Sequence, residues 1–237
     1  MNDKLPFKYV GGDPSLDLVN TVDWTERGPE KERLSDYARL TRWAEGAGLV
    51  SKAEAERFRR AGAARPKEAR AAHDAALRLR SVLQRLYESL AAGKRSDWKE
   101  FNELLGKALR QLGVSPPRKG QLSAEWEWHS TESLESLLWP VTWSAAILLT
   151  SEEAGRIRVC AALDCGWMYV DRSRNGLRRW CQMETCGNLE KSRRRAGRSR
   201  PGVETPGVTA TRGAAAVELG ANPSITPRSC SRTVSRE

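Results

Sequence analysis

The chain has 237 residues, of which 39% are hydrophobic and 30% charged, and its formal net charge is +10 at pH 7. This composition can support a buried core in one large domain or two small ones, and it excludes a chain that is disordered throughout. The longest stretch without a charged residue, 136 to 151, spans 16 residues and contains Pro140, which predicts that no helix crosses a membrane.

The N-terminus carries no recognisable targeting segment. Its first residues turn polar before any apolar run develops, unlike a secretory signal or a transit peptide, so we expect a cytoplasmic protein. A Gly11-Gly12 turn follows, and residues 14 to 21 then predict a capped short helix or an extended segment.

The region from 35 to 113 is predicted to be helical. Apolar residues recur there at intervals of three and four, which is the spacing of an amphipathic helix. Capping and stop signals divide the region. The expected helices are 35 to 47, Ser51 (in a capping box with Glu54) to 60, Pro66 to Gly93, and Asp97 (in a capping box with Glu100) to Gly113.

One strand and one more helix complete the expected helical body. Alternating Glu and Trp residues within 122 to 129 predict a strand, the only one indicated in the first half of the chain. Residues 134 to 149 predict a sixth helix with a kink at Pro140. We therefore expect a mainly α fold, with a helical domain over 1 to 152.

The basic residues are concentrated in one short region. Residues 156 to 200 contain twelve Lys or Arg and four Asp or Glu, a net charge of +8, so nearly all of the +10 of the whole chain lies there. A near-neutral body attached to a strongly basic module of this size indicates a polyanion as the partner of that module.

Four of the five cysteines lie in the same region. Cys160, Cys165, Cys181 and Cys186 follow the spacing Cys-x4-Cys-x15-Cys-x4-Cys, whereas Cys230 stands alone and is interpreted as a bystander. In a reducing cytosol, two such pairs predict a tetrahedral zinc site with one structural ion. Four buried thiols, a redox-active set or an iron-sulfur cluster are the alternatives.

The residues around the cysteines predict a treble-clef-like zinc finger over 153 to 200. Residues 166 to 171 indicate a strand that leaves the first cysteine pair, and residues 178 to 180 indicate a return strand. A helix is expected to begin near Gly187, and Trp167 with Trp180 is expected to form the small core of the finger.

Two segments resemble a known protein family. The run from Cys160 to Asn188, which ends in Cys186-Gly187-Asn188, is similar to the CGNR zinc finger. Residues 11 to 21, Gly-Gly-Asp-Pro-Ser-Leu-Asp-Leu-Val-Asn-Thr, resemble the opening of the helical ABATE domain that precedes this finger in bacterial proteins regarded as stress-induced transcription regulators. The resemblance implies a finger that binds DNA and a helical domain that receives a signal. Leu189 stands where the family carries Arg.

The residue types around the finger independently favour nucleic acid binding. Arginines fill the loop between the cysteine pairs, and basic residues at helical spacing form a stripe after Gly187. The predicted contact residues are Arg172, Arg174, Asn175, Arg178, Arg179, Asn188, Lys191, Arg194, Arg195 and Arg198. The alternatives are a solvated basic helix that binds nothing specific, an RNA-binding or protein-interaction module, and a zinc-thiolate redox sensor.

Other features favour structural roles. No motif of a nucleotide-binding, hydrolase or metalloprotease site is present, so we expect no enzyme activity. Most of the tryptophans of the helical body are interpreted as core, and Asp17 and Asn20 fit either a polar site or turn hydrogen bonds. Residues 201 to 237 contain no aromatic residue, and they predict a disordered tail.

Overall fold

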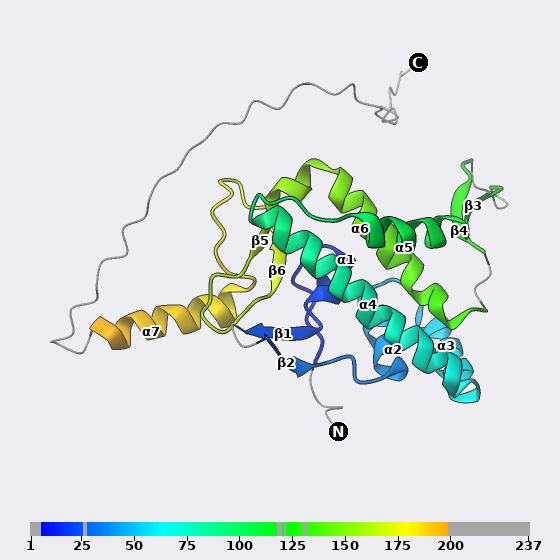
Figure 1. Ribbon diagram of the computed structural model, residues 1–237, viewed down its shortest axis with the longest axis horizontal. Coiled ribbons are helices and arrows are strands. Elements are labelled where there is room, and N and C mark those ends of the chain that lie inside the picture. The colour runs from blue at the N-terminus through cyan, green and yellow to red at the C-terminus, as the bar shows by residue number, and fades with distance from the viewer. Residues whose placement is uncertain (1–5, 26–27, 118–119, 121, 130–131, 199–237) are drawn as a thin grey trace, which may run out of the picture. The chain divides into compact units, whose positions relative to one another are not determined.

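The computed structural model describes residues 6–25, 28–117, 120, 122–129 and 132–198 (Figure 1). The tail at 201–237 and Cys230 lie outside the described residues. The α-helices are α1 (Pro14–Val19), α2 (Tyr37–Gly46), α3 (Lys52–Ala64), α4 (Pro66–Ala91), α5 (Lys99–Leu109), α6 (Trp139–Thr150) and α7 (Asn188–Arg198). The antiparallel strand pairs are β1 (Val22–Thr25) with β2 (Gly28–Glu32), β3 (Leu112–Ser115) with β4 (Glu125–Trp128), and β5 (Ile157–Val159) with β6 (Met168–Val170).

The mainly α fold is confirmed. The Ser51–Glu54 capping box opens α3, with the Ser51 hydroxyl accepting from the Glu54 N–H and the Glu54 carboxylate accepting from the Ser51 N–H. Pro66 occupies the first turn of α4, where the backbone N–H that it lacks would have no partner within the helix. Among the described residues, no helix combines the length and the apolar character needed to cross a membrane.

Four local predictions were wrong, and each has a physical reason. The hairpin of β1 and β2 was missed because Gly28, Pro29 and three charged residues give β2 no apolar alternation. The fifth helix ends at Leu109, since Leu112 and Gly113 pair with Trp128 and Glu127 across β3 and β4. The two remaining errors concern Asp97 and Pro140.

At Asp97 no capping box forms. Its carboxylate accepts only from the Lys99 N–H (2.9 Å), because the Glu100 carboxylate is drawn to Arg78 and Arg85 on α4. Pro140 causes no kink: it sits in the first turn of α6, after a short 3-10 helix over Leu134–Leu138. A proline in the first turn costs no hydrogen bond, so the chain needs no bend there.

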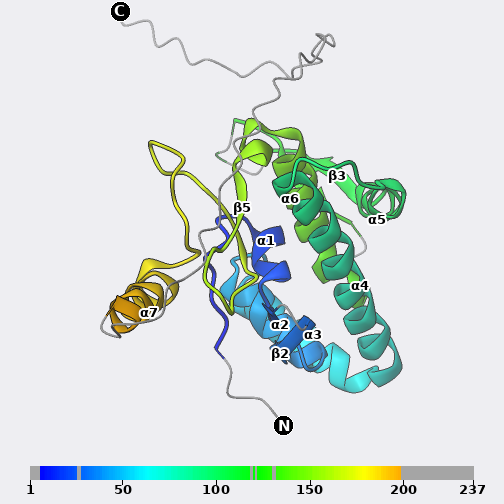
Figure 2. The same ribbon diagram turned by 60° about the vertical axis from the view of Figure 1, so that its left-hand side comes forward.

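The long helix α4 lines the core along one of its faces. Its buried face includes Leu79, Leu83, Leu86 and Tyr87, and helices α1, α2, α5 and α6 all pack against α4 or against one another (Figures 1 and 2). The hairpin of β5 and β6 joins the same core through the side chains of Ile157, Met168 and Val170, all of which are buried. Residues after 152 therefore complete the core of the helical body, and the expected division between 152 and 153 stays a prediction.

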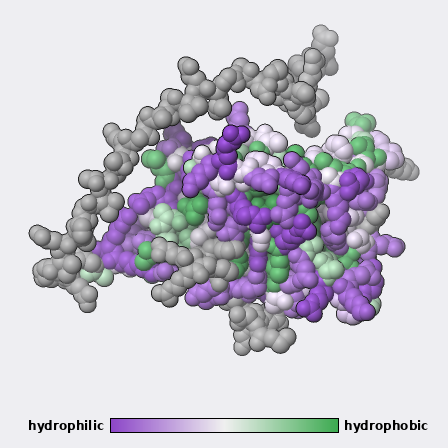
Figure 3. All heavy atoms as spheres, viewed as in Figure 1, coloured by the Kyte–Doolittle hydropathy of each residue, from purple (hydrophilic) through white to green (hydrophobic). Residues whose placement is uncertain are grey.

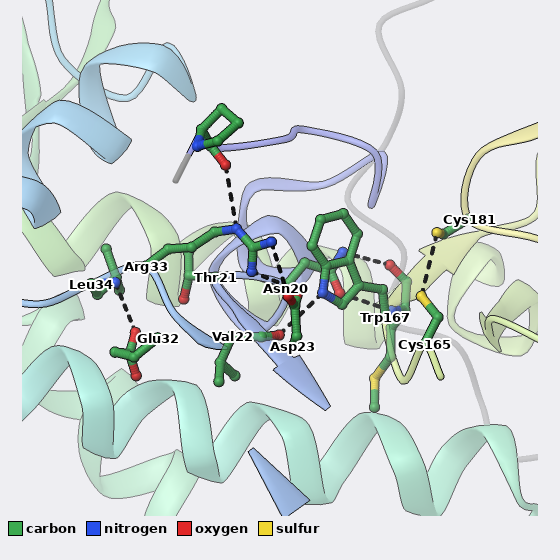
Figure 4. Close-up of polar contacts among 12 residues, drawn as sticks. Asn20, Thr21, Val22, Asp23, Glu32, Arg33, Leu34, Cys165, Trp167 and Cys181 are labelled. Atoms are coloured by element: carbon green, nitrogen blue, oxygen red, sulfur yellow. Dashed lines mark hydrogen bonds and ion pairs between the residues drawn. The ribbon is translucent and has the colours of Figure 1, made fainter. Parts of the chain in front are cut away.

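The opening motif, residues 11 to 21, holds β6 in place. Asn20 donates from Nδ2 to the Met168 carbonyl and accepts at Oδ1 from the Met168 N–H, both at 2.8 Å. The Val170 N–H donates to the Gly11 carbonyl (2.9 Å), and the Trp167 indole N–H donates to the Val22 carbonyl (3.1 Å; Figure 4). The motif thus satisfies backbone groups of a strand about 150 residues further along the chain.

The two glycines of the motif are required by close packing. A Cβ at Gly11 would lie 2.7 Å from the Leu16 Cβ, which is closer than side chains can approach. Gly12 has a φ of +82°, and its carbonyl accepts from Arg172 Nη1 at 3.0 Å. Residues with a side chain rarely adopt that φ. The glycine pair therefore gives the backbone the shape that contacts the segment after β6.

Asp17 gives a pH-dependent stability. Its carboxylate is buried beside the Gly11 N–H (2.8 Å), and burial raises its pKa from 3.8 to about 6. The folded protein therefore takes up a proton between pH 6 and pH 4 that the unfolded chain does not, so the cost of the buried charge is present above pH 6 and is relieved as the pH falls. Asp17→Asn removes this charge.

We expect the free energy of unfolding of Asp17→Asn, relative to the parent, to fall by about 2 kcal/mol between pH 7 and pH 4. Urea unfolding of both proteins at several pH values measures this difference. A difference that stays constant over the whole range would contradict the role of the buried charge.

Candidate zinc centre and nucleic-acid interface

The four cysteines of the sequence motif come together at one point. The ligand atoms of Cys160, Cys165, Cys181 and Cys186 all lie within 4.8 Å of one another, and none of the four forms a disulfide. Cys160 and Cys165 lie in the turn between β5 and β6. Cys181 precedes a single π-helical turn over Met183–Gly187, and that turn carries Cys186 and leads directly into α7.

The sulfur positions match a tetrahedral zinc site. Bonds of about 2.3 Å from zinc to sulfur place tetrahedral sulfurs roughly 3.8 Å apart. The Cys165 and Cys181 sulfurs are 3.8 Å apart (Figure 4). Those of Cys181 and Cys186 are 3.6 Å apart. With four thiols at these distances, the residues present fit one structural zinc ion and leave no ligand position open for catalysis.

The electrostatics of the cluster also call for a cation. Hydrogen bonds from the Cys165 and Cys181 thiols, and from the Cys181 N–H, lower the pKa of Cys160 well below its ordinary value. The same contacts with Cys160 raise the pKa values of Cys165 and Cys181. The thiols of Cys160, Cys165 and Cys181 therefore do not all ionise by themselves, and a divalent ion would supply the charge that holds the cluster as thiolates.

The cysteine cluster connects the β5–β6 hairpin, which is packed into the helical core, to helix α7, which has few other contacts. The pair on β5 and β6 is fixed to the helical core, as described above. Helix α7 is fixed mainly by the π-helical turn before it and by two side chains. Glu190 accepts from the Leu163 N–H (3.3 Å), and Arg193 pairs with Asp164 (2.8 Å) and with Glu190 (2.9 Å). The metal centre, through Cys186, is thus the main anchor of α7 to the rest of the finger.

Family comparisons agree with this arrangement of a helical body and a four-cysteine centre. Residues 12–152 match the family model ABATE, described as "putative stress-induced transcription regulator", and residues 156–199 match the CGNR zinc finger. The chain belongs to the ABATE family. A search of the curated proteins found no match to this chain.

In the CGNR finger the first cysteine pair and the helix after the second pair lie where they were expected, but the predicted hairpin between them does not form. The segment 178–180 is not a strand, because β6 already pairs with β5, which precedes the first cysteine. A single backbone bond, from the Ala161 N–H to the Arg179 carbonyl (2.8 Å), is what brings that segment back to the knuckle. The small core of the finger is confirmed: Trp167 is buried and Trp180 half-buried, both beside the cysteines.

The basic stripe lies on the face of α7 that points away from the knuckle. Glu190 and Arg193 face the knuckle, and at 100° per residue the positions 188, 191, 195 and 198 lie on the far side. Lys191 and Arg194 are exposed, and neither makes a hydrogen bond or ion pair within the described chain. Arg195 is also exposed, and only the backbone of Arg198 is described. In Figure 3 the surface of α7, at the left, is mostly hydrophilic.

Several of the predicted contact residues have partners inside the protein. Arg172 pairs with Glu153 (2.5 Å), and the Arg178 guanidinium donates to the Trp180 carbonyl (2.9 Å) and lies 4.2 Å from the centre of the Tyr169 ring. Asn188 donates to the Glu184 carbonyl (3.2 Å), and the Asn175 side chain accepts from the Leu177 N–H (3.3 Å). Arg174 and Arg179 remain exposed, and Arg179 lies over the Trp180 ring at 5.5 Å. The roles of these residues in nucleic acid binding stay predictions.

The sequence did not reveal the residues that link the ABATE domain to the finger. Arg33 forms an ion pair with Asp23 (2.7 Å) and stacks on the Trp167 ring at 5.0 Å from its centre (Figure 4). Among the alternatives considered for Asn20, hydrogen bonding is the correct one, but its partner lies on β6 instead of in a local turn. Contacts at such sequence separation leave no signal in local spacing.

The interpretation of the body tryptophans as core is correct only in part. Trp43 and Trp139 are buried, but Trp126 on β4 is 67% exposed and contacts Trp143 of α6, with ring centres 6.4 Å apart. Trp126 shares a face of β4 with Trp128, whose ring centre lies 6.0 Å from that of Trp139, but Trp143 covers only a small part of the Trp126 ring. Figure 3 shows hydrophobic atoms at this hairpin, at the upper right.

Proposed function

We propose that this protein is a transcription regulator of the cytoplasm that binds duplex DNA through the CGNR finger and has no enzyme activity. The observation that carries the proposal is the division of α7 into two faces. One face ties the helix to the zinc knuckle through Glu190 and Arg193, and the other presents Lys191 to solvent with no hydrogen bond or ion pair to the described chain. Arg194 is exposed beside Glu190, at the edge between the two faces. A basic helix that is fixed at one side and free at the other suits the phosphates of a DNA groove.

Two observations favour duplex DNA over single-stranded nucleic acid. Stacking on single-stranded bases needs an exposed aromatic face. Trp167 is buried and its indole N–H is bonded to the Val22 carbonyl, while Arg179 covers the half-buried Trp180. Binding of single-stranded RNA or DNA by the finger is therefore the weaker alternative.

The helical domain offers a place for a signal. A cavity of about 550 Å³ lies between α2, α3 and α4, a size within the range of small-molecule sites. The Tyr37 ring, Gly62 and Ala69 line its apolar part, and Arg70 and Asp74 are among its charged residues. We include in the proposal that the ABATE domain senses a small molecule here.

Salt dependence of DNA binding tests the proposal. Five basic residues of the finger, Arg179, Lys191, Arg194, Arg195 and Arg198, predict that log K against log salt has a slope of about −4.5 for duplex DNA. Lys191→Ala with Arg194→Ala should reduce the magnitude of this slope by about 2 and should weaken all sequences alike. Fluorescence anisotropy with a random-sequence duplex measures both.

The matched control is Arg60→Ala with Lys67→Ala, which removes the same charge from exposed positions on α3 and α4. This pair should leave the slope unchanged. A slope near zero for the parent protein would refute DNA binding, and an equal effect of both pairs would show that only net charge matters. Leu189→Arg is a further arm: Leu189 is 50% exposed on α7, so an arginine there should steepen the slope by about 1 if it reaches phosphate.

A further inference from the structure

The loop between β6 and the second cysteine pair presents an unusual pair of side chains. Leu177 is 71% exposed, and Arg174 is exposed with no hydrogen bond or ion pair to the described chain. They lie on either side of Gly176, which has a φ of +64° and so turns the backbone at the tip. Neither side chain contributes to the packing of the finger.

The loop over 172–178 is nevertheless held in one conformation by hydrogen bonds to the buried Asp171. Asp171 is fully buried, and its carboxylate accepts from the N–H of Ser173 (2.9 Å), from the Ser173 hydroxyl (2.5 Å) and from the N–H of Arg178 (3.0 Å). Burial acts to raise the pKa of Asp171, but these hydrogen bonds outweigh it and lower the pKa. One charged carboxylate therefore clamps both ends of the loop.

Further bonds fix the loop to the rest of the finger. The guanidinium of Arg156 donates to the Ser173 carbonyl (2.8 Å), and the Tyr169 hydroxyl donates to the Arg178 carbonyl (2.6 Å). At the tip, the N–H of Gly176 donates to the Ser173 carbonyl (3.2 Å). A loop with this many bonds loses little conformational entropy when it binds a partner.

We propose that this loop reads bases in the groove of duplex DNA, with Arg174 hydrogen-bonding to base edges and Leu177 making apolar contact beside it. The inference rests on the proposed function, since the same finger holds the phosphates through α7. A preorganised, cationic loop with an exposed apolar tip matches a surface that combines anionic phosphates with apolar base edges. Asp171 is the positioning residue, because it sets the shape of the loop without reaching the solvent itself.

Selection of bound sequences from a random duplex pool tests this proposal. The parent protein should enrich a sequence motif. Arg174→Ala should lose the preference at one or two base pairs and bind the parent motif about 10-fold more weakly, while its affinity for random duplex changes little. Leu177→Ala should weaken the preference at a neighbouring position.

Variants of α7 supply the comparison. Lys191→Ala with Arg194→Ala should weaken binding to all sequences and still enrich the parent motif. Asp171→Asn should lose the motif preference, as Arg174→Ala does, while the salt slope stays at the parent value. Zinc content and far-ultraviolet circular dichroism equal to those of the parent show that each variant is folded.

The outcomes separate this inference from the proposed function. Absence of duplex binding by the parent at low salt would overturn both. Binding without an enriched motif, or the same motif with Arg174→Ala and Leu177→Ala as with the parent, would overturn the groove-reading role alone and leave the phosphate-binding role of α7 in place.

Discussion

Replacing Cys181 by serine is expected to abolish stable zinc binding and to release α7 while the helical body stays folded. A structural zinc site of four thiolates holds its ion with an apparent free energy on the order of 10 kcal/mol or more, and loss of one ligand removes a large part of it. Because β5 and β6 share the core of the body through Ile157 and Met168, the first cysteine pair remains anchored there. The release should therefore be confined to residues from 181 onward.

Metal analysis and hydrogen exchange check this prediction together. The parent should carry one zinc per chain and slow exchange over α7, and Cys181→Ser should lose both while α4 stays protected. Cys230→Ser is the matched control, since Cys230 stands outside the Cys-x4-Cys-x15-Cys-x4-Cys motif in the sequence, and it should keep the zinc. Protein purified without chelator and found free of zinc, or melting of α4 in the Cys181 variant, would show the prediction to be wrong.

Replacing Asn20 by alanine is expected to lower the free energy of unfolding by about 3 kcal/mol. Asn20 is 2% exposed and satisfies both backbone groups of Met168, which has no exposed surface, so alanine would leave a buried donor and a buried acceptor without partners. Each such group costs roughly 1 to 3 kcal/mol. For a protein of this size, that loss corresponds to a decrease of about 6 to 12 °C in the melting temperature.

Thermal and urea unfolding measure the effect. Asn102→Ala is the control, because Asn102 lies exposed on α5 and makes no side-chain hydrogen bond within the described chain. It should change the free energy of unfolding by less than about 0.5 kcal/mol. Equal stability of the two variants would mean that the contact between the opening motif and β6 contributes little.

Much of the fold and the metal ligands could be predicted because their signals are local. The helices α2, α3 and α4 follow from apolar spacing and from capping residues within a few positions, as at Ser51. The two Cys-x4-Cys spacings likewise indicate two tight turns that each present a pair of ligands to one zinc ion. The features that could not be predicted depend on side chains that are far away in the sequence. The Glu100 carboxylate was assigned to a local capping box, but α4 lies close enough to offer two arginines.

The nucleic-acid interface shows the same limit at the level of single side chains. Composition places the positive charge in the finger, but it does not distinguish a guanidinium that braces the fold from one that faces solvent. Arg178 and Arg179 are adjacent in sequence, yet the Arg178 guanidinium closes onto the Trp180 carbonyl and the Tyr169 ring, while Arg179 is exposed. Only the path of the backbone around Asp171 decides this difference.

The contact of residues 11 to 20 with β6 also bears on how the protein is made. During synthesis, the first helix leaves the ribosome long before Met168 and Val170, so the core of the helical body stays open until the first third of the finger has emerged. A fragment that ends at residue 152, where the ABATE match ends, would lack the side chains of Ile157, Met168 and Val170 that complete the core. The apolar surface left uncovered would favour aggregation. Nascent chains of this protein therefore depend on protection from association until residue 170 has emerged.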